Sequence, residues 1–269
     1  MLTAPAPVVL DKVSMRFGGH LGVEALRNVS FDFDAGQFVS IVGPSGCGKS
    51  TILSLVAGLR LPSSGRVLRA GEPVTGPVTS AGMVFQKPVL LDWRTTLGNV
   101  MLSAEAHGME KTSAEKRARQ LLMSVGLAGF ESAYPRELSG GMQQRVSICR
   151  ALIHEPDMLL MDEPFAALDA ITRDQISLDL GNMLQERFVS VLFVTHSVPE
   201  AVFLSDKIIV MTGRPGQVQR TISVDLPRPR NLHVRQTSKF GQYVEDILEL
   251  FMAAGLLRDD NWQSKDKRI

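Results

Sequence analysis

The string GPSGCGKST, residues 43–51, constrains this chain more than any other stretch of its sequence. It lies between two apolar runs, 38–42 and 52–56, which predicts a buried strand that turns through glycines into a helix. The glycines permit backbone angles at which successive N–H groups point at one anion, and the helix N-terminus adds positive potential. Lys49 can then reach the outer phosphates of a nucleotide, and the Ser50 hydroxyl can bind Mg²⁺. We therefore predict a phosphate-binding loop.

Length and charge limit the remaining possibilities. A chain of 269 residues, 44% of them hydrophobic, can bury a full α/β core with a smaller attached lobe. The net charge is only +1, from 29 basic and 28 acidic side chains, so we expect no nucleic-acid partner. No apolar segment approaches the roughly 18 residues needed to cross a bilayer, and the N-terminus does not resemble a secretory signal. We therefore expect a cytosolic protein.

The two cysteines, Cys47 and Cys149, form neither a metal-ligand spacing nor a disulfide framework, which is typical of a reducing compartment. Cys47 lies within the predicted phosphate loop. The positive field there could favour a reactive thiolate, or the residue could simply fill a tight turn, and we favour the second interpretation.

Polar residues follow three further apolar runs, at 81–85, 158–161 and 191–194. Because the carboxyl ends of parallel strands meet at one edge of a sheet, these residues are expected beside the phosphate loop. A carboxylate there can hold Mg²⁺ and its neighbour can accept a proton from water, although two acids could merely cap a helix. A single histidine is more often structural than catalytic, but its place at this edge favours a role. The residues concerned are Gln86, Asp162, Glu163 and His196.

The order of the runs predicts the fold class. Strand and helix patterns alternate, which indicates a mostly parallel central sheet with helices on both faces. The first 35 residues alternate as strands do and form an antiparallel β part, in which Phe17 either stacks on a nucleotide base or joins the core. Between about 87 and 156 the pattern becomes helical, so we expect an inserted helical lobe. In that lobe Thr112 and Glu115 have the spacing of a capping box, and Gly126 marks a helix end.

A second glycine-rich helix start follows at LSGGMQQR, from Leu138 onward, with Ser139, Gly140 and Gly141 at its opening. By the same reasoning it is a second anion site, separated from the first by the helical lobe. One bound nucleotide need not touch both sites, unless a second copy of the chain supplies one of them.

Taken together, these strings resemble the ATP-binding subunit of ABC transporters over nearly the whole chain. A phosphate loop alone would also admit kinases and GTPases, but the order of the strings is specific. They are GPSGCGKST, Gln86, LSGGMQQR, the run 159–163, the run 167–169 and His196. The resemblance implies that residues 1–230 form the ATP-binding domain, with the lobe inserted at about 87–156, and that 231–269 form a C-terminal helical tail.

The resemblance also implies roles for individual residues. Phe17 would stack on adenine, Glu163 would polarise the attacking water, and His196 would contact the γ-phosphate. The signature serine and glycines would bind the ATP of the opposite subunit in a homodimer, where Asp169 would lie at the interface. Met142 stands where the commonest signature has Gln, a change that leaves the helix N–H groups in place. The expected ATP-binding residues are Gly43, Pro44, Ser45, Gly46, Cys47, Gly48, Lys49, Ser50 and Thr51; the signature residues are Ser139, Gly140, Gly141 and Met142; and the Mg²⁺ ligands are Ser50, Gln86 and Asp162.

A closer similarity is to importers of nitrate, sulfonate, taurine and related small solutes. It is carried by the segment 89–94, by 96–100 and by the proline-rich stretch 226–230, which looks like a stiff linker. The apolar residues 89–93 are either ordinary core or a docking surface. The similarity implies a membrane permease dimer that docks near 86–94, an external substrate-binding protein, and a peripheral location on the cytoplasmic face of the inner membrane. An ABC-type ATPase that acts on DNA or ribosomes is the alternative.

Overall fold

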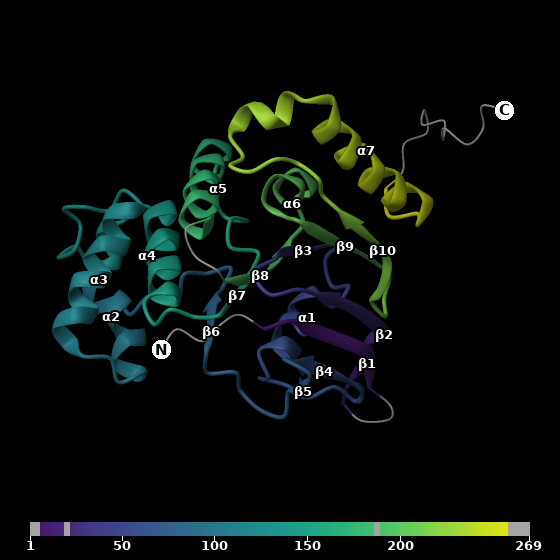
Figure 1. Cartoon of the computed structure of the whole chain (residues 1–269), viewed down its shortest axis with the longest axis horizontal. Coiled ribbons are helices and arrows are strands. Elements are labelled where there is room, and N and C mark those ends of the chain that lie inside the picture. Colours follow the sequence, from purple (N-terminus) through teal and green to yellow (C-terminus); the bar gives the residue numbers. More distant parts are fainter. Residues whose placement is uncertain (1–5, 19–21, 186–188, 258–269) are drawn as a thin grey trace.

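The computed structural model describes residues 6–18, 22–185 and 189–257, and its elements form two sheets with helices around them (Figure 1). The larger sheet has the strand order β10-β9-β3-β8-β7-β6, and every neighbouring pair in it is parallel except β9 and β10. The smaller sheet, β2-β1-β4-β5, is antiparallel. This arrangement confirms the predicted α/β class, with a mostly parallel sheet and an antiparallel N-terminal part.

The strands are β1 (Val8–Phe17), β2 (Val23–Phe33), β3 (Phe38–Val42), β4 (Ser64–Arg69), β5 (Glu72–Pro73), β6 (Ala81–Val84), β7 (Met158–Asp162), β8 (Ser190–Thr195), β9 (Lys207–Thr212) and β10 (Gln217–Ser223). The helices are α1 (Lys49–Val56), α2 (Thr96–Ala106), α3 (Lys111–Ser124), α4 (Gly140–Leu152), α5 (Ala170–Gln185), α6 (Val198–Leu204) and α7 (Ser238–Ala253), with short 3₁₀ turns at Pro135–Glu137 and Leu232–Gln236.

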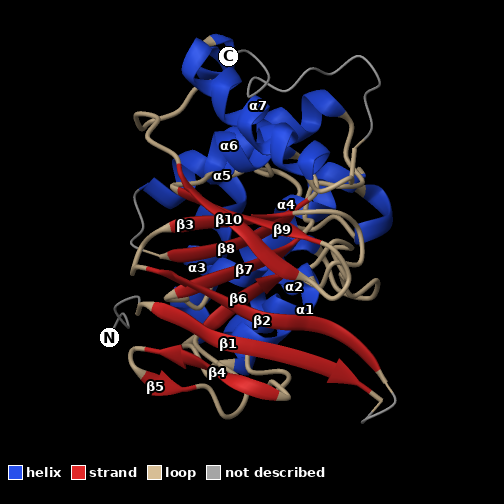
Figure 2. Ribbon diagram, turned by 90° about the vertical axis from the view of Figure 1, so that its right-hand side faces the viewer, coloured by secondary structure: helices blue, strands red, loops and turns tan. Residues whose placement is uncertain are grey.

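Two apolar clusters cover the faces of the larger sheet. One cluster joins α1 to the inner face of the smaller sheet, and the other joins helices α2 to α7 to the opposite face. Strands β3 and β8 therefore have no exposed residue, since both of their faces are covered. In Figure 1, α2, α3 and α4 stand apart as a helical lobe, as the sequence predicts. Figure 2 shows the strands of the two sheets stacked below α5, α6 and α7.

One local prediction from the sequence is wrong. Helix α3 begins at Lys111, and its cap is the Glu110 carboxylate, which accepts hydrogen bonds from the N–H groups of Thr112 and Ser113, both at 2.7 Å. Those two bonds hold the pKa of Glu110 at about 2, so the proposed box from Thr112 to Glu115 does not form. The helix does end before Gly126, whose φ of 72° is left-handed.

The stretch 226–230, predicted as a stiff linker, has neither helix nor strand, and it is anchored to the fold. The Arg230 side chain is buried and donates to the carbonyls of Phe203 and Ser205, at 3.0 and 2.8 Å, at the end of α6. Helix α7 then packs on the same region through Phe240, Ile247 and Phe251. The predicted division of the chain at residue 230 stays a prediction. None of the helices described is both long and apolar enough to cross a membrane.

Candidate functional site

The loop between β3 and α1 has the geometry that its glycines require. Gly46 and Gly48 have φ values of 76° and 95°, which residues with a side chain rarely adopt. A Cβ on Gly48 would also lie 2.5 Å from the Leu26 side chain. The Lys49 side chain is buried, and its ammonium donates to the carbonyls of Gly43 and Pro44, at 2.9 and 3.0 Å. The Lys49 side chain is therefore held across the loop, where its ammonium could contact a bound phosphate.

Strand β7 brings Asp162 to the same edge of the sheet. The Ser50 hydroxyl donates to Asp162 Oδ1 at 2.9 Å, so two of the expected Mg²⁺ ligands are in direct contact. Burial raises the pKa of Asp162, and a bound cation would counter that shift. A hydroxyl and a carboxylate are hard oxygen ligands of the kind that Mg²⁺ takes together with nucleotide phosphates, so these residues fit the ion. In the described part of the chain no three His, Cys, Asp or Glu side chains gather into a metal cluster of their own.

Glu163 lies between Lys49 and His196. Its Oε1 is 3.9 Å from the Lys49 ammonium, and its Oε2 is 3.3 Å from His196 Nδ1. Its backbone has a φ of 45°, unusual for a residue with a side chain, and its N–H donates to Val194 O at 2.9 Å. The turns after β3, β7 and β8 thus bring a cation, a carboxylate and an imidazole together. His196 keeps 53% of its side chain exposed, which leaves room for a ligand.

Two other candidates lie beyond this cluster. Gln86 follows β6, the strand next to β7, and is exposed. Phe17 ends β1 in the smaller sheet, and the Arg60 guanidinium lies 5.2 Å from the centre of its ring. That cation occupies one side of the ring that the resemblance assigns to a base.

The signature residues form a separate group beside the start of α5. Ser139 caps α4 and accepts a hydrogen bond from Met142 N at 3.3 Å. Asp169 accepts one from Thr172 N at 3.0 Å. Gly141 faces Thr172 so closely that a Cβ would lie 2.5 Å from the threonine methyl. Signature and interface candidates are thus neighbours, as two parts of one contact surface would be.

Four residues that the sequence did not single out support these loops. Arg214 donates to Ser45 O at 3.3 Å, and Glu200 accepts from Thr195 Oγ1 at 2.7 Å beside His196. From α4, Gln144 donates to Phe85 O at 3.2 Å, and Arg150 donates to Pro88 O and Val89 O, at 2.7 and 2.8 Å. Sequence spacing could not reveal these residues, because each acts through a backbone or side-chain contact set by the tertiary fold.

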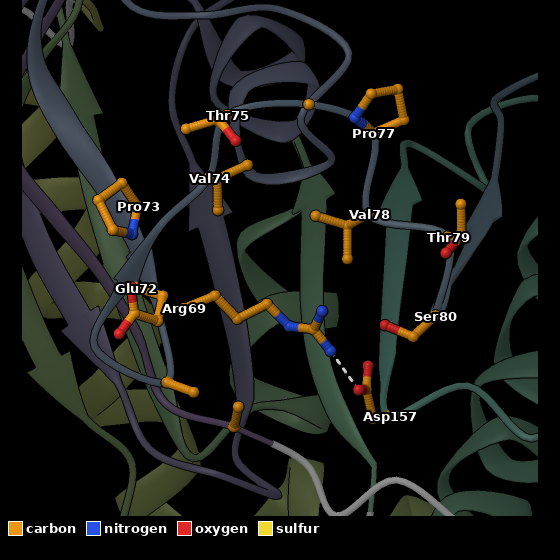
Figure 3. Close-up of a pocket in the computed structure, with 13 residues that line it drawn as sticks. Arg69, Glu72, Pro73, Val74, Thr75, Pro77, Val78, Thr79, Ser80 and Asp157 are labelled. Atoms are coloured by element: carbon orange, nitrogen blue, oxygen red, sulfur yellow. Dashed lines mark hydrogen bonds and ion pairs between the residues drawn. The ribbon is translucent and has the colours of Figure 1, made fainter.

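A cavity of about 640 Å³ lies away from this site (Figure 3). Its wall includes Arg69 and the loop 74–80, and an ion pair joins Arg69 to the buried Asp157. Asp157 directly precedes β7, whose far end carries Asp162. The cavity therefore opens at the amino edge of the sheet, opposite the phosphate loop, and belongs to a different part of the molecule.

Comparison with known proteins agrees with the geometry of the loop and the signature. The family model described as ABC transporter matches residues 26–166. An uncharacterized ABC transporter ATP-binding protein of Methanocaldococcus jannaschii is 46% identical over 228 residues, or 85% of this chain and 84% of that protein. The aliphatic sulfonates import ATP-binding protein SsuB of Bacillus cereus is 37% identical over 252 residues, or 93% of this chain and 98% of that protein.

Solved structures agree with the fold. The dimeric structure of a bacterial ABC transporter cassette is similar with a TM-score of 0.73 and 33% identity, over 82% of this chain and 100% of that one. A dimeric post-hydrolysis state of the same ATP-binding cassette, bound to ADP and Pi, gives a TM-score of 0.71 and 32% identity over the same shares of the two chains.

Proposed function

The chain belongs to the ABC transporter family as an ATP-binding subunit and ATPase, and we propose that it drives the import of a sulfonate or a related small solute. The single observation that carries the choice of solute is the similarity to aliphatic sulfonates import proteins along 93% of this chain. Nitrate and taurine belong to the same proposed class. The subunit itself need not touch the solute, because its substrate is ATP.

In ATP hydrolysis, the residues at the carboxyl ends of the parallel strands have different roles. Lys49 and the loop N–H groups bind the phosphates, and Glu163, held between Lys49 and His196, orients and polarises the attacking water. His196 contacts the γ-phosphate. Mg²⁺, held by Ser50, Asp162 and Gln86, would neutralise charge on the phosphates. Phe17 stacks on the adenine after Arg60 moves aside or joins the stack from the other face.

The second half of each site comes from another copy of the chain. Ser139 and Gly141 of one copy close on the ATP held by the Lys49 loop of the other, and Asp169 lies between the copies. The dimeric cassettes that resemble this chain support such a pairing. A two-fold dimer of this kind buries two nucleotides, so ATP holds the copies together and hydrolysis lets them part.

We infer that the permease docks on the segment 86–94, at the inner side of the membrane. Val89 and Trp93 are 61% and 75% exposed there, more than buried core would allow. Val89 has a φ of 47°, a strained value for a β-branched residue, and two hydrogen bonds from Arg150 hold its carbonyl and that of Pro88. A strained and exposed apolar segment that the rest of the fold holds rigid is a suitable docking surface.

Replacement of Trp93 by Asp tests the docking surface in the native host. The tagged wild-type chain should be recovered with integral membrane proteins. With the Trp93→Asp chain, the amount of membrane protein recovered should be at least about tenfold lower, the scale of the loss of one interface anchor. Met123→Asp is the matched control, since Met123 is 64% exposed but lies on α3. Recovery of the wild-type chain with DNA or ribosomes instead of membrane proteins would contradict the importer proposal.

A further inference from the structure

Glu200 is a buried carboxylate directly behind the His196 loop. It lies in the first turn of α6, and only 7% of its side chain is exposed. Its Oε2 accepts a hydrogen bond from Thr195 Oγ1 at 2.7 Å. The same hydroxyl accepts from Ser197 N at 3.0 Å, and Ser197 Oγ accepts from Glu200 N at 3.4 Å. The residues on both sides of His196 are therefore tied to Glu200.

The other carboxylate oxygen faces helix α5. Glu200 Oε1 lies 3.4 Å from Arg173 Nε, and the same guanidinium donates to Leu168 O at 2.8 Å. The backbone N–H of Arg173 also donates to Asp169 O at 2.9 Å. Arg173 thus holds the two residues that precede α5, one of which is the proposed interface residue Asp169.

From these contacts we propose that Glu200 and Arg173 are positioning residues that join the His196 loop to the Leu168–Asp169 segment. A shift of Asp169 as a second copy docks would then move His196 against Glu163 and the γ-phosphate. This inference rests on the proposed roles of His196 and Asp169 and adds the link between them. The negative charge of Glu200 is the essential feature, because Arg173 pairs only with the ionised carboxylate.

Burial of that charge opposes stability. Burial raises the pKa of Glu200, although the positive groups that face it, Arg173, His196 and Arg235, act in the opposite direction. A carboxyl group whose pKa is raised in the folded state stabilises the fold while it is protonated, and that contribution is lost as pH rises through the raised pKa. Ionisation of Glu200 therefore works against the stability of the fold, as expected for a residue that serves function.

The test is Glu200→Gln, which keeps the size of the side chain and an oxygen for Thr195 but presents no charge to Arg173. We expect kcat for ATP hydrolysis to fall about ten- to hundredfold, the scale of a small misplacement of a catalytic group, with nearly unchanged ATP affinity. The melting temperature should be no lower than that of the wild type. Arg173→Met should lower kcat similarly, and the double variant should lose little more, since both changes break one link.

The pH profile separates positioning from packing. Protonation of Glu200 in the wild type removes the same charge as the substitution, so the ratio of wild-type to Glu200→Gln kcat should shrink toward one as pH falls. A ratio that stays constant with pH would overturn the proposal. Asp179→Asn is the matched control, because Asp179 lies on α5 and pairs with Arg145 of α4 without contact to this link, and the variant should retain wild-type kcat.

Two further variants, Thr195→Val and His196→Ala, separate a failure of the link from a failure to fold and from a failure of the proposed function. If Glu200→Gln does not fold, Thr195→Val removes the same link from its other end, and wild-type kcat in that variant would overturn the inference. His196→Ala, measured in parallel, tests the proposed function itself. Full activity of His196→Ala would refute the site assignment, whereas an inactive His196→Ala beside a fully active Glu200→Gln would refute only the link.

Discussion

Glu163 occupies a left-handed backbone conformation between a lysine and a histidine, a geometry that the fold must hold against its intrinsic preference. Glu163→Gln keeps the size of the side chain but removes its ability to accept a proton. We expect steady-state ATP hydrolysis to fall at least about a hundredfold while ATP-dependent dimerisation persists. Hydrolysis assays and size-exclusion chromatography with ATP measure the two properties. Glu115→Gln, at an ion pair on α3, should change neither, and undiminished turnover of Glu163→Gln would remove Glu163 from its role.

The reactivity of the Cys47 thiol depends on two opposing effects in the loop, burial and the positive charge of Lys49. The sulfur is fully buried, and burial raises the pKa of the thiol although Lys49 acts in the opposite direction. The structure therefore favours the interpretation that Cys47 fills the turn. We expect iodoacetamide at pH 7.5 to label Cys47 at least about tenfold more slowly in the folded chain than in urea, because thiolate and access are both reduced. Peptide mass spectrometry reports the rate, and equal labelling in both states would contradict this account.

At the scale of single residues, the sequence predicted the chemical groups better than their contacts. Lys49, Ser50, Asp162, Glu163 and His196 were found from strand ends and glycine spacing, and the fold brings them together. The carbonyls that Lys49 contacts and the support of Glu200 were not predicted. Those contacts depend on side-chain directions and on the distance between loops far apart in the chain, which hydrophobic periodicity does not encode.

The contact between α4 and α5 depends on the absence of one side chain. A Cβ on Gly141 would lie 2.5 Å from the Thr172 methyl, so Gly141→Ala should force the two helices apart or turn Thr172 away from Asp169. We expect a loss of about 1–3 kcal/mol, or roughly 2–10 °C in melting temperature by calorimetry.

Two variants isolate the clash. Adding Thr172→Ser removes the methyl and keeps the hydroxyl, so it should restore most of the loss from Gly141→Ala. Gly181→Ala on α5 places a Cβ in open space and should stabilise by up to about 1 kcal/mol through helix propensity. Equal effects of the alanines at 141 and 181 would show that the contact with Thr172 is unimportant.

At the scale of elements, type and order were predicted and the ends were not. The phosphate-loop helix, the helical lobe and the signature helix are present where glycines and apolar spacing placed them. The cap of α3 was mistaken because Glu110, an uncommon capping residue, starts the helix two residues earlier than a Thr112 cap would. The stretch 226–230 was predicted as a stiff linker from its prolines, but the contact of the Arg230 guanidinium with the carbonyls at the end of α6 was not predicted.

At the scale of the whole molecule, the parallel sheet followed from alternating strands and helices, but the strand order did not. That order places β3 between β8 and β9. The phosphate loop after β3 therefore lies next to His196, which follows β8, and β8 alone separates β3 from β7, which ends in Asp162. Long-range pairing of this kind is set by the packing of both sheet faces together. In the sequence, only the two predicted anion sites indicate a second copy of the chain.

The central claim is that one ATP is bound by two copies of the chain. A crystal structure of the Glu163→Gln variant grown with ATP and Mg²⁺ tests it most directly. We expect two nucleotides in a two-fold dimer, each with its γ-phosphate within hydrogen-bond distance of Lys49 from one copy and of Ser139 from the other. Nucleotides bound by Lys49 alone, with Ser139 of every copy facing solvent, would contradict the account.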